Sequence, residues 1–125
     1  MEDFEFSEEF CRFIQGTITA VDAAELLLWY RGHQDRVIAL DEVVAKLGPG
    51  ISAGDAEKYV ELFVARGLIV RVEGGYRYRP ESELAPQVER LAVAYNQRPV
   101  TLIRVIYAFR DSSIKSFADA FRLRK

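Results

Sequence analysis

The stretch from Asp41 to Pro80 constrains the fold of this chain more than any other part of its sequence. Two segments with helical apolar spacing stand on either side of Gly48-Pro49-Gly50, and two short β-prone runs follow around Glu73-Gly74-Gly75. Proline cannot continue a helix, and glycine permits backbone angles that other residues avoid. The stretch therefore predicts a helix, a sharp break, a second helix and a β-hairpin.

The two helices have their own boundary signals. We expect Asp41 to cap the first helix and Gly48 to close it, and we expect Ser52 to cap the second and Gly67 to end it. The second helix has apolar residues at the 3,1,3,1 spacing of one helical face, which is the face expected in the core. These residues are Ala56, Tyr59, Val60, Phe63 and Val64.

The hairpin is expected to join residues 68–72 to residues 76–79. A two-residue Gly74-Gly75 loop would pair Val72 with Arg77, which mixes apolar and charged side chains on one face. A three-residue loop pairs Val72 with Tyr76 and is the register that we prefer on this pattern. That register places Arg71, Arg77 and Arg79 together on one basic face.

Helical patterns flank this stretch on both sides. On the N-terminal side we expect helices at about 7–15, capped by Ser7 and ended by Gly16, and at 19–31, capped by Thr19, followed by a short strand at 37–40. Trp29 and Tyr30 are expected in a core or an interface, and His33 in a solvated turn. On the C-terminal side we expect helices at 86–95, 99–110 and 113–125. The fold class expected is mainly α with a small β-hairpin.

The chain of 125 residues is long enough for one domain with a buried core. We expect a single domain over 1–125, with a core unit at about 20–80, the N-terminal helix at about 7–15 and a C-terminal helical extension at about 83–125. Net charge is −2, and it is unevenly spread: residues 1–50 carry −6, residues 51–98 carry zero and residues 99–125 carry +4.

The residue types that chemistry requires are scarce. Cys11 and His33 are the only cysteine and histidine, and no phosphate-binding glycine loop is present. We therefore expect no catalytic site, no metal site and no cofactor, so the chain is not expected to be an enzyme. The acidic start lacks the pattern of a secretory signal, and no apolar run reaches the roughly 18 residues of a membrane span, so we expect a cytoplasmic protein with no membrane partner.

The segment ARGLIVRVEGGYRYRP resembles the end of a recognition helix followed by a wing. Over about residues 20 to 80 the chain resembles winged-helix transcription regulators of the broad MarR-like kind, and the resemblance implies a winged helix-turn-helix with extra N- and C-terminal helices. It also implies that the second helix approaches the DNA major groove. The residues that would bind double-stranded DNA are then Ser52, Lys58, Arg71, Arg77 and Arg79.

The surface chemistry leaves two functions open. The first is a DNA-binding transcriptional regulator that grips DNA mainly through the wing, because three carboxylates among the outward positions of the second helix would be repelled by phosphate. The alternative is a winged-helix module for protein interaction or dimerisation that does not bind DNA. A homodimer is expected in either case, since residues 99–110 are apolar nearly throughout. The expected dimer interface is Val100, Ile103, Ile106, Tyr107 and Phe109.

Overall fold

The computed structural model describes residues 6–110 and shows a mainly helical chain with one small antiparallel hairpin. This confirms the coarse fold class expected from the sequence. The helices are α1 (Glu8–Thr17), α2 (Val21–Gly32), α3 (Leu40–Leu47), α4 (Ala53–Ala65), α5 (Ala85–Gln97) and α6 (Pro99–Arg110), and the strands are β1 (Ile69–Val72) and β2 (Gly75–Tyr78). The helix expected at 113–125 lies outside the described residues.

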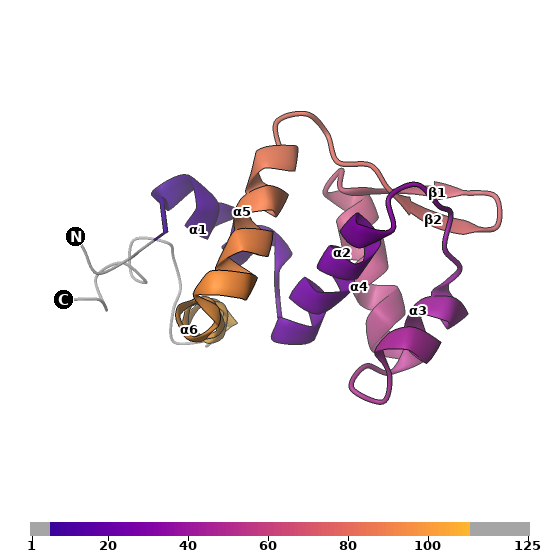
Figure 1. The fold of residues 1–125 in the computed structure, drawn as a ribbon, viewed down its shortest axis with the longest axis horizontal. Helices are drawn as coiled ribbons and strands as arrows, with labels where there is room; N and C mark the ends of the chain where they lie inside the picture. The colour runs from indigo at the N-terminus through magenta and orange to yellow at the C-terminus, as the bar shows by residue number, and fades with distance from the viewer. Residues whose placement is uncertain (1–5, 111–125) are drawn as a thin grey trace.

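The helices form two groups that meet along the length of the molecule (Figure 1). At one end, α1 packs on α5 and α6; at the other, α3 packs on α4. The helix α2 lies between them and contacts both α4 and α5, and the hairpin extends from the α3–α4 end. One continuous hydrophobic core, from Phe10 in α1 to Ile106 in α6, joins the two groups.

Several of the predicted helix boundaries are confirmed, among them the starts of α1 and α4 and the end of α4. The side chain of Ser7 accepts a hydrogen bond from Phe10 N at 3.1 Å, and that of Ser52 accepts one from Asp55 N at 3.1 Å. Such caps satisfy backbone donors that have no partner inside the helix. Gly67 follows the end of α4 with φ +82, the left-handed conformation that glycine adopts without strain.

The predicted N-caps of α2 and α3 are wrong, whereas Gly48 is the C-cap of α3 as expected. Their N-cap residues are Ala20 and Ala39, neither of which has a side chain that can accept a hydrogen bond. Asp41 is instead inside the first turn of α3, where its carboxylate is favoured by the positive end of the helix dipole. The end of α1 also falls one residue after the expected Gly16, at Thr17.

The hairpin register differs from both registers considered above. Val72 pairs with Gly75, Val70 with Arg77 and Arg71 with Tyr76, so the loop consists of Glu73 and Gly74 alone. Gly74 takes the left-handed conformation with φ +92, whereas Gly75 belongs to the strand. Counting both glycines as loop residues therefore shifted the expected pairing.

The physical reason for this register lies in the segment before α3. Ile38 forms an isolated antiparallel bridge with Tyr76, with N–O distances of 2.8 and 3.0 Å. The strand expected at 37–40 is thus reduced to a one-residue bridge, and Leu40 already begins α3. The chain passes so close to Gly75 that a Cβ there would lie 2.5 Å from the carbonyl oxygen of Ile38. Only glycine fits this position, so the second glycine serves a close approach between strands rather than the turn.

Candidate functional site

Helix α4 is the element that the resemblance places in a DNA groove. Its inward face is fixed in the core by Ala56, Val60 and Phe63, each fully buried. The hydroxyl of Tyr59 donates to Asp22 at 3.1 Å and so ties α4 to the first turn of α2. Burial and then this hydrogen bond raise the pKa of Tyr59 to about 12. The orientation of α4, and therefore the identity of its outward face, is set by these contacts.

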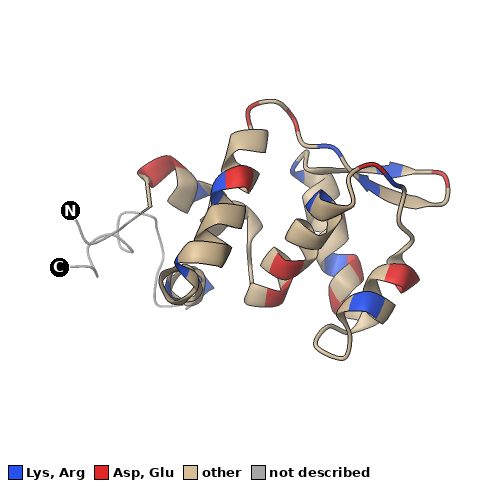
Figure 2. Cartoon of the chain, viewed as in Figure 1, with Lys and Arg blue, Asp and Glu red and all other residues tan. Residues whose placement is uncertain are grey.

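The outward face of α4 has few cations near its start. Its exposed residues over the first two turns, with the cap, are Ser52, Ala53, Gly54, Asp55, Glu57 and Lys58. Lys58 is the only cation among them, and Arg66 is exposed at the far end. Figure 2 shows both acidic and basic positions on the ribbons at the α3–α4 end rather than basic positions alone. The predicted residues Ser52 and Lys58 are thus accessible but stand among carboxylates.

The first predicted wing cation, Arg71, is bound to α4. Its guanidinium forms an ion pair with Glu61, and the hydroxyl of Tyr76 donates to the same carboxylate at 2.7 Å. The hydrogen bond from Tyr76, and then the charge of Arg71, lower the pKa of Glu61 below its usual value. Glu61 is consequently ionised at neutral pH, and it offsets the charge that Arg71 would bring to a phosphate.

The two remaining wing arginines lie on the other face of the hairpin. Residues paired across two antiparallel strands point to the same face of the hairpin, and successive residues of one strand point to alternate faces. Arg71 pairs with Tyr76 and therefore shares its face, whereas Arg77, the next residue in β2, points to the other face. The N–H of Arg79 donates to the carbonyl of Leu68 at 3.0 Å, which continues the ladder and keeps Arg79 on the face of Arg77. The expected single basic face of three arginines is therefore wrong.

Arg77 and Arg79 border a shallow hollow beside the end of α2. Both side chains are exposed, and Arg77 Nε donates to the backbone carbonyl of Gln34 at 3.2 Å. With Gln34, Tyr78 and Pro80 these arginines line a hollow of about 320 Å³. Gln34 was not singled out in the sequence, because its position next to the hairpin depends on how the segment after α2 returns toward β2.

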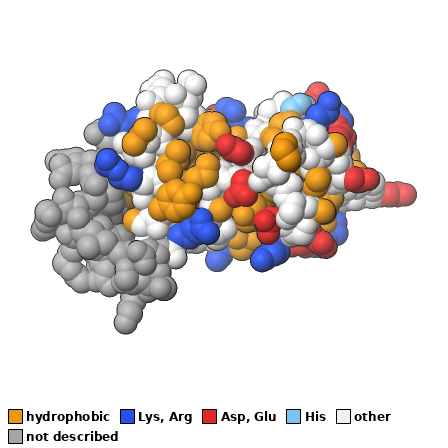
Figure 3. Space-filling view, turned by 90° about the horizontal axis from the view of Figure 1, so that it is seen from below, with side chains coloured by type: hydrophobic (Ala, Val, Ile, Leu, Met, Phe, Trp, Pro, Cys, Tyr) orange, Lys and Arg blue, Asp and Glu red, His pale blue; other side chains and the backbone are white. Residues whose placement is uncertain are grey.

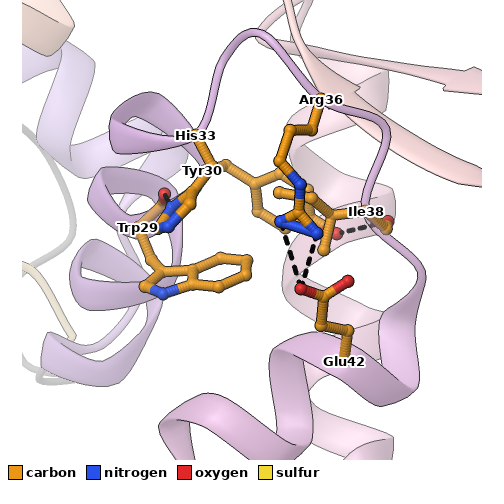
Figure 4. A network of polar contacts seen from close by, with 6 residues as sticks. All are labelled: Trp29, Tyr30, His33, Arg36, Ile38 and Glu42. Carbon is orange, nitrogen blue, oxygen red and sulfur yellow. Dashed lines mark hydrogen bonds and ion pairs between the residues drawn. The ribbon is translucent and has the colours of Figure 1, made fainter.

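The segment that joins α2 to α3 is held by a small network (Figure 4). The hydroxyl of Tyr30 donates to the carbonyl of Ile38 at 3.2 Å, and Arg36 forms an ion pair with Glu42 at 2.7 Å. Burial raises the pKa of Tyr30 far above its usual value. Tyr30 lies in the core, as expected from the sequence.

His33 is more constrained than a solvated turn residue. It caps the C-terminus of α2, its Nδ1 lies 2.8 Å from the carbonyl oxygen of Trp29, and its ring centroid lies 4.3 Å from that of Trp29 (Figure 4). The carbonyl can only accept, so Nδ1 carries the proton in this contact. The expected location at a turn is right, but the ring is packed rather than free. The network has a structural role, since it fixes the extended segment that pairs with β2.

The five residues predicted for a dimer interface differ in their exposure on helix α6. Ile106 is 1% exposed and belongs to the hydrophobic core, and Phe109 packs against that core. Placing Ile106 in an interface is therefore wrong, because α6 uses it to bury its own inner face. Val100 and Tyr107 are 67% and 53% exposed, and Ile103 lies between them in the chain with partial exposure. Figure 3 shows hydrophobic side chains gathered at the end of the molecule where α5 and α6 lie, with basic side chains around them.

An open hollow of about 500 Å³ lies between α1 and α5. Its apolar lining includes Phe6, Phe10, Val93 and Ala94, with Glu89 and Arg90 among its polar residues. No sequence pattern indicated this hollow, because it depends on how α1 crosses α5. It holds no arrangement of nucleophile and base.

The described residues, 6–110, were searched for a metal site and for a membrane-spanning helix. Within that range no three His, Cys, Asp or Glu side chains come together to hold a metal ion. Nor does any helix in the same range have the length and apolar character needed to cross a membrane. Comparison with protein-family models found no match, and comparison with curated proteins and with solved structures found no significant match either.

Proposed function

We propose that this chain is a winged-helix protein-interaction module that acts without catalysis and does not grip duplex DNA through its second helix. The winged-helix assignment is supported by the order of elements over residues 20–80: α2, the extended segment at Ile38, then α3, α4 and the β1–β2 hairpin. A helix, a short strand, two helices and a hairpin in this order match the arrangement in which α4 takes the recognition position.

The observation that carries the choice of function is the contact between Glu61, Arg71 and Tyr76. A wing that binds DNA needs its arginines available to phosphate, because affinity comes mainly from counterion release. Arg71 instead neutralises a carboxylate of α4. Asp55 and Glu57 remain exposed on the same helix, and no arginine is present among the exposed residues at its start to contact a guanine edge. The recognition position is thus electrostatically opposed to DNA.

Arg77 and Arg79 favour a second candidate function, DNA binding through the wing alone. They are exposed on one face of the hairpin beside Gln34. Two phosphate contacts would give a slope of about −1.8 in log affinity against log salt, which is typical of weak, sequence-independent binding. This candidate keeps the role of a DNA-binding regulator, with the duplex lying along the outer face of the wing.

One titration distinguishes the two functions. Fluorescence anisotropy of a mixed-sequence DNA duplex at about 50 mM salt, where phosphate contacts are strongest, should show no saturable binding by the native chain. Saturable binding at micromolar protein that is abolished by Arg77→Glu with Arg79→Glu would overturn the proposal in favour of the wing.

Two variants with the same change in charge test whether the carboxylates of α4 are what prevents DNA binding. Replacing Asp55 and Glu57 by lysine alters the charge of α4 by four units without touching a buried residue. If repulsion by α4 is what prevents binding, this variant should acquire measurable, salt-sensitive DNA binding at about 50 mM salt. The control is Asp41→Lys with Glu83→Lys, which adds the same charge on exposed positions outside α4. Equal binding by both variants would show that net charge alone matters.

A further inference from the structure

An open hollow of about 430 Å³ lies where α1, the end of α4 and the start of α5 meet. Its walls come from three separate segments, which are residues 9–17 of α1, Arg66 after α4, and residues 83–87. The volume is within the range of about 300–1,000 Å³ that is usual for small-molecule sites. The lining combines apolar side chains, among them Phe13 and Leu84, with charged and polar ones. This size and mixed lining are typical of a site for a small polar molecule.

Two of the lining residues are buried and polar. Thr17 of α1 is 5% exposed and Gln87 of α5 is 4% exposed, and apart from Cys11 and tyrosines no other polar residue within 6–110 is buried. The Oε1 atom of Gln87 accepts a hydrogen bond from Arg90 at 3.2 Å. The amide NH₂ group of Gln87 and the hydroxyl of Thr17 have no hydrogen-bond partner among the described residues. Because buried polar groups are nearly always hydrogen-bonded, these two groups mark the hollow as a binding site.

Four charged side chains line the hollow, two of each sign. Arg12 and Glu9, both on α1, already form ion pairs with other side chains, at 2.7 and 3.5 Å. Arg66 and Glu83 are exposed, and within residues 6–110 neither forms an ion pair with the other or with any other side chain. One available cation and one available anion therefore line the same hollow.

We propose that this hollow binds a free α-amino acid, whose carboxylate pairs with Arg66 and whose ammonium group pairs with Glu83. A ligand with a single charge would be attracted by one of these side chains and repelled by the other, whereas a zwitterion matches both. A guanidinium can bind a carboxylate through two parallel hydrogen bonds. The amide of Gln87 donates to an oxygen of the ligand, and the hydroxyl of Thr17 donates or accepts. This inference goes beyond the proposed function and does not depend on it.

The first test is thermal unfolding of the full chain with each of the common L-amino acids. A ligand with a dissociation constant of about 1 mM should raise the thermal midpoint when it is present at about 10 mM. We expect at least one amino acid to do so, and calorimetry to show saturable binding at one site. The N-acetyl amide of that amino acid has the same side chain but neither charge, and it should give no shift. The inference is wrong if no amino acid raises the midpoint, or if the N-acetyl amide binds equally well.

Gly16 allows the hollow to be filled without disturbing the core. It lies in α1 and lines the hollow, and a Cβ added there would meet no atom within 4 Å. Gly54 in α4 has equally open surroundings but does not line this hollow. Gly16→Leu should therefore abolish binding of the amino acid, and Gly54→Leu, the same change in another helix, should leave it unchanged. Full binding by Gly16→Leu would place the ligand elsewhere and overturn the inference.

Charge variants test the two ionic contacts by calorimetry with the amino acid that gives the largest shift. Arg66→Gln and Glu83→Gln should each raise the dissociation constant about tenfold or more, because each removes a charge-assisted contact. The controls Arg104→Gln and Glu73→Gln, at exposed positions that do not line the hollow, should leave it unchanged. A loss of affinity through Arg66→Gln alone would indicate a site for a simple carboxylate and would contradict the zwitterion.

Thr17→Val separates a contact with the ligand from a role in the fold. The variant keeps the shape of the side chain and removes a buried hydroxyl that has no partner among the described residues. Replacing such a group by an apolar one costs no hydrogen bond in the folded chain. The thermal midpoint of the ligand-free chain should therefore stay the same or rise, while the dissociation constant for the amino acid increases severalfold. A lower midpoint with unchanged affinity would show that the hydroxyl supports the fold, and would contradict the inference.

Discussion

Helices α4 and α6 are nearly equal in length, and each buries one face in the same hydrophobic core, yet their outward faces are opposite in chemistry. The outward face of α4 is polar and has exposed carboxylates at Asp55 and Glu57. That of α6 has exposed Val100 and Tyr107, with the guanidinium of Arg110 5.6 Å from the Tyr107 ring centroid.

This difference shows that the position of a helix in a fold does not determine its partner. In the winged-helix arrangement that we propose, α4 takes the recognition position, but its charge opposes a polyanion. The helix with large exposed apolar side chains is α6, which lies outside residues 20–80. Apolar area left exposed in a monomer is a common mark of an interaction surface.

The largest expected changes in the free energy of unfolding come from substitutions on the buried faces of α4 and α6. On those faces we expect similar effects from the two helices. Phe63→Ala in α4 should lower the free energy of unfolding by about 3–5 kcal/mol, and Leu102→Ala in α6 by about 2–5 kcal/mol, because both leave cavities in the core. Urea unfolding followed by circular dichroism measures both. The exposed-site control is Val93→Ser, for which we expect a change within about 0.5 kcal/mol. A neutral Leu102→Ala would mean that α6 is not part of the common core.

A smaller effect is expected at the start of α4. Ser52→Ala removes the acceptor for Asp55 N and should cost about 1 kcal/mol of stability. Ser82→Ala, at an exposed loop position, is the matched control and should have almost no effect. Thermal unfolding of both variants under one set of conditions gives the comparison. Equal midpoints for the two would show that α4 is positioned by its core residues alone.

The smallest effect is pH-dependent and involves the tie between α4 and the hairpin. The pKa of Glu61 is lowered in the folded chain, first by the hydrogen bond from Tyr76 and then by Arg71. A lowered pKa means that the contribution to stability is present above the usual carboxyl value of 4.5 and is lost as the pH falls through the folded value. Glu61→Gln should therefore have a lower thermal midpoint than the native chain at neutral pH, and the gap should close in acid.

Glu57→Gln is the control for that measurement, since Glu57 is exposed on the same helix. The thermal midpoint of this variant should equal that of the native chain both at neutral pH and in acid. A Glu61→Gln gap that persists unchanged at low pH would indicate that the ion pair with Arg71 does not contribute to holding the hairpin against α4.

The local sequence was enough to predict most of the helices and strands, but it did not predict how they pack against one another. The caps at Ser7 and Ser52 and the end of α4 before Gly67 are settled within a few residues of chain, so the pattern was enough to predict them. The N-caps of α2 and α3 were misplaced by one and two residues. For α3 the reason is that an acidic residue such as Asp41 is as favourable in the first turn as at the cap.

The sequence by itself determined that the chain is mainly helical, that a break separates α3 from α4, and that a glycine hairpin follows. The tertiary structure alone decided which arginine is available, because the approach of Ile38 to Gly75 sets the register and thereby turns Arg71 toward Glu61. It also decided that Ile106 packs inward while Tyr107, the next residue, faces out. On a helix that is apolar nearly all round, only the packing against α1 and α5 selects the buried face.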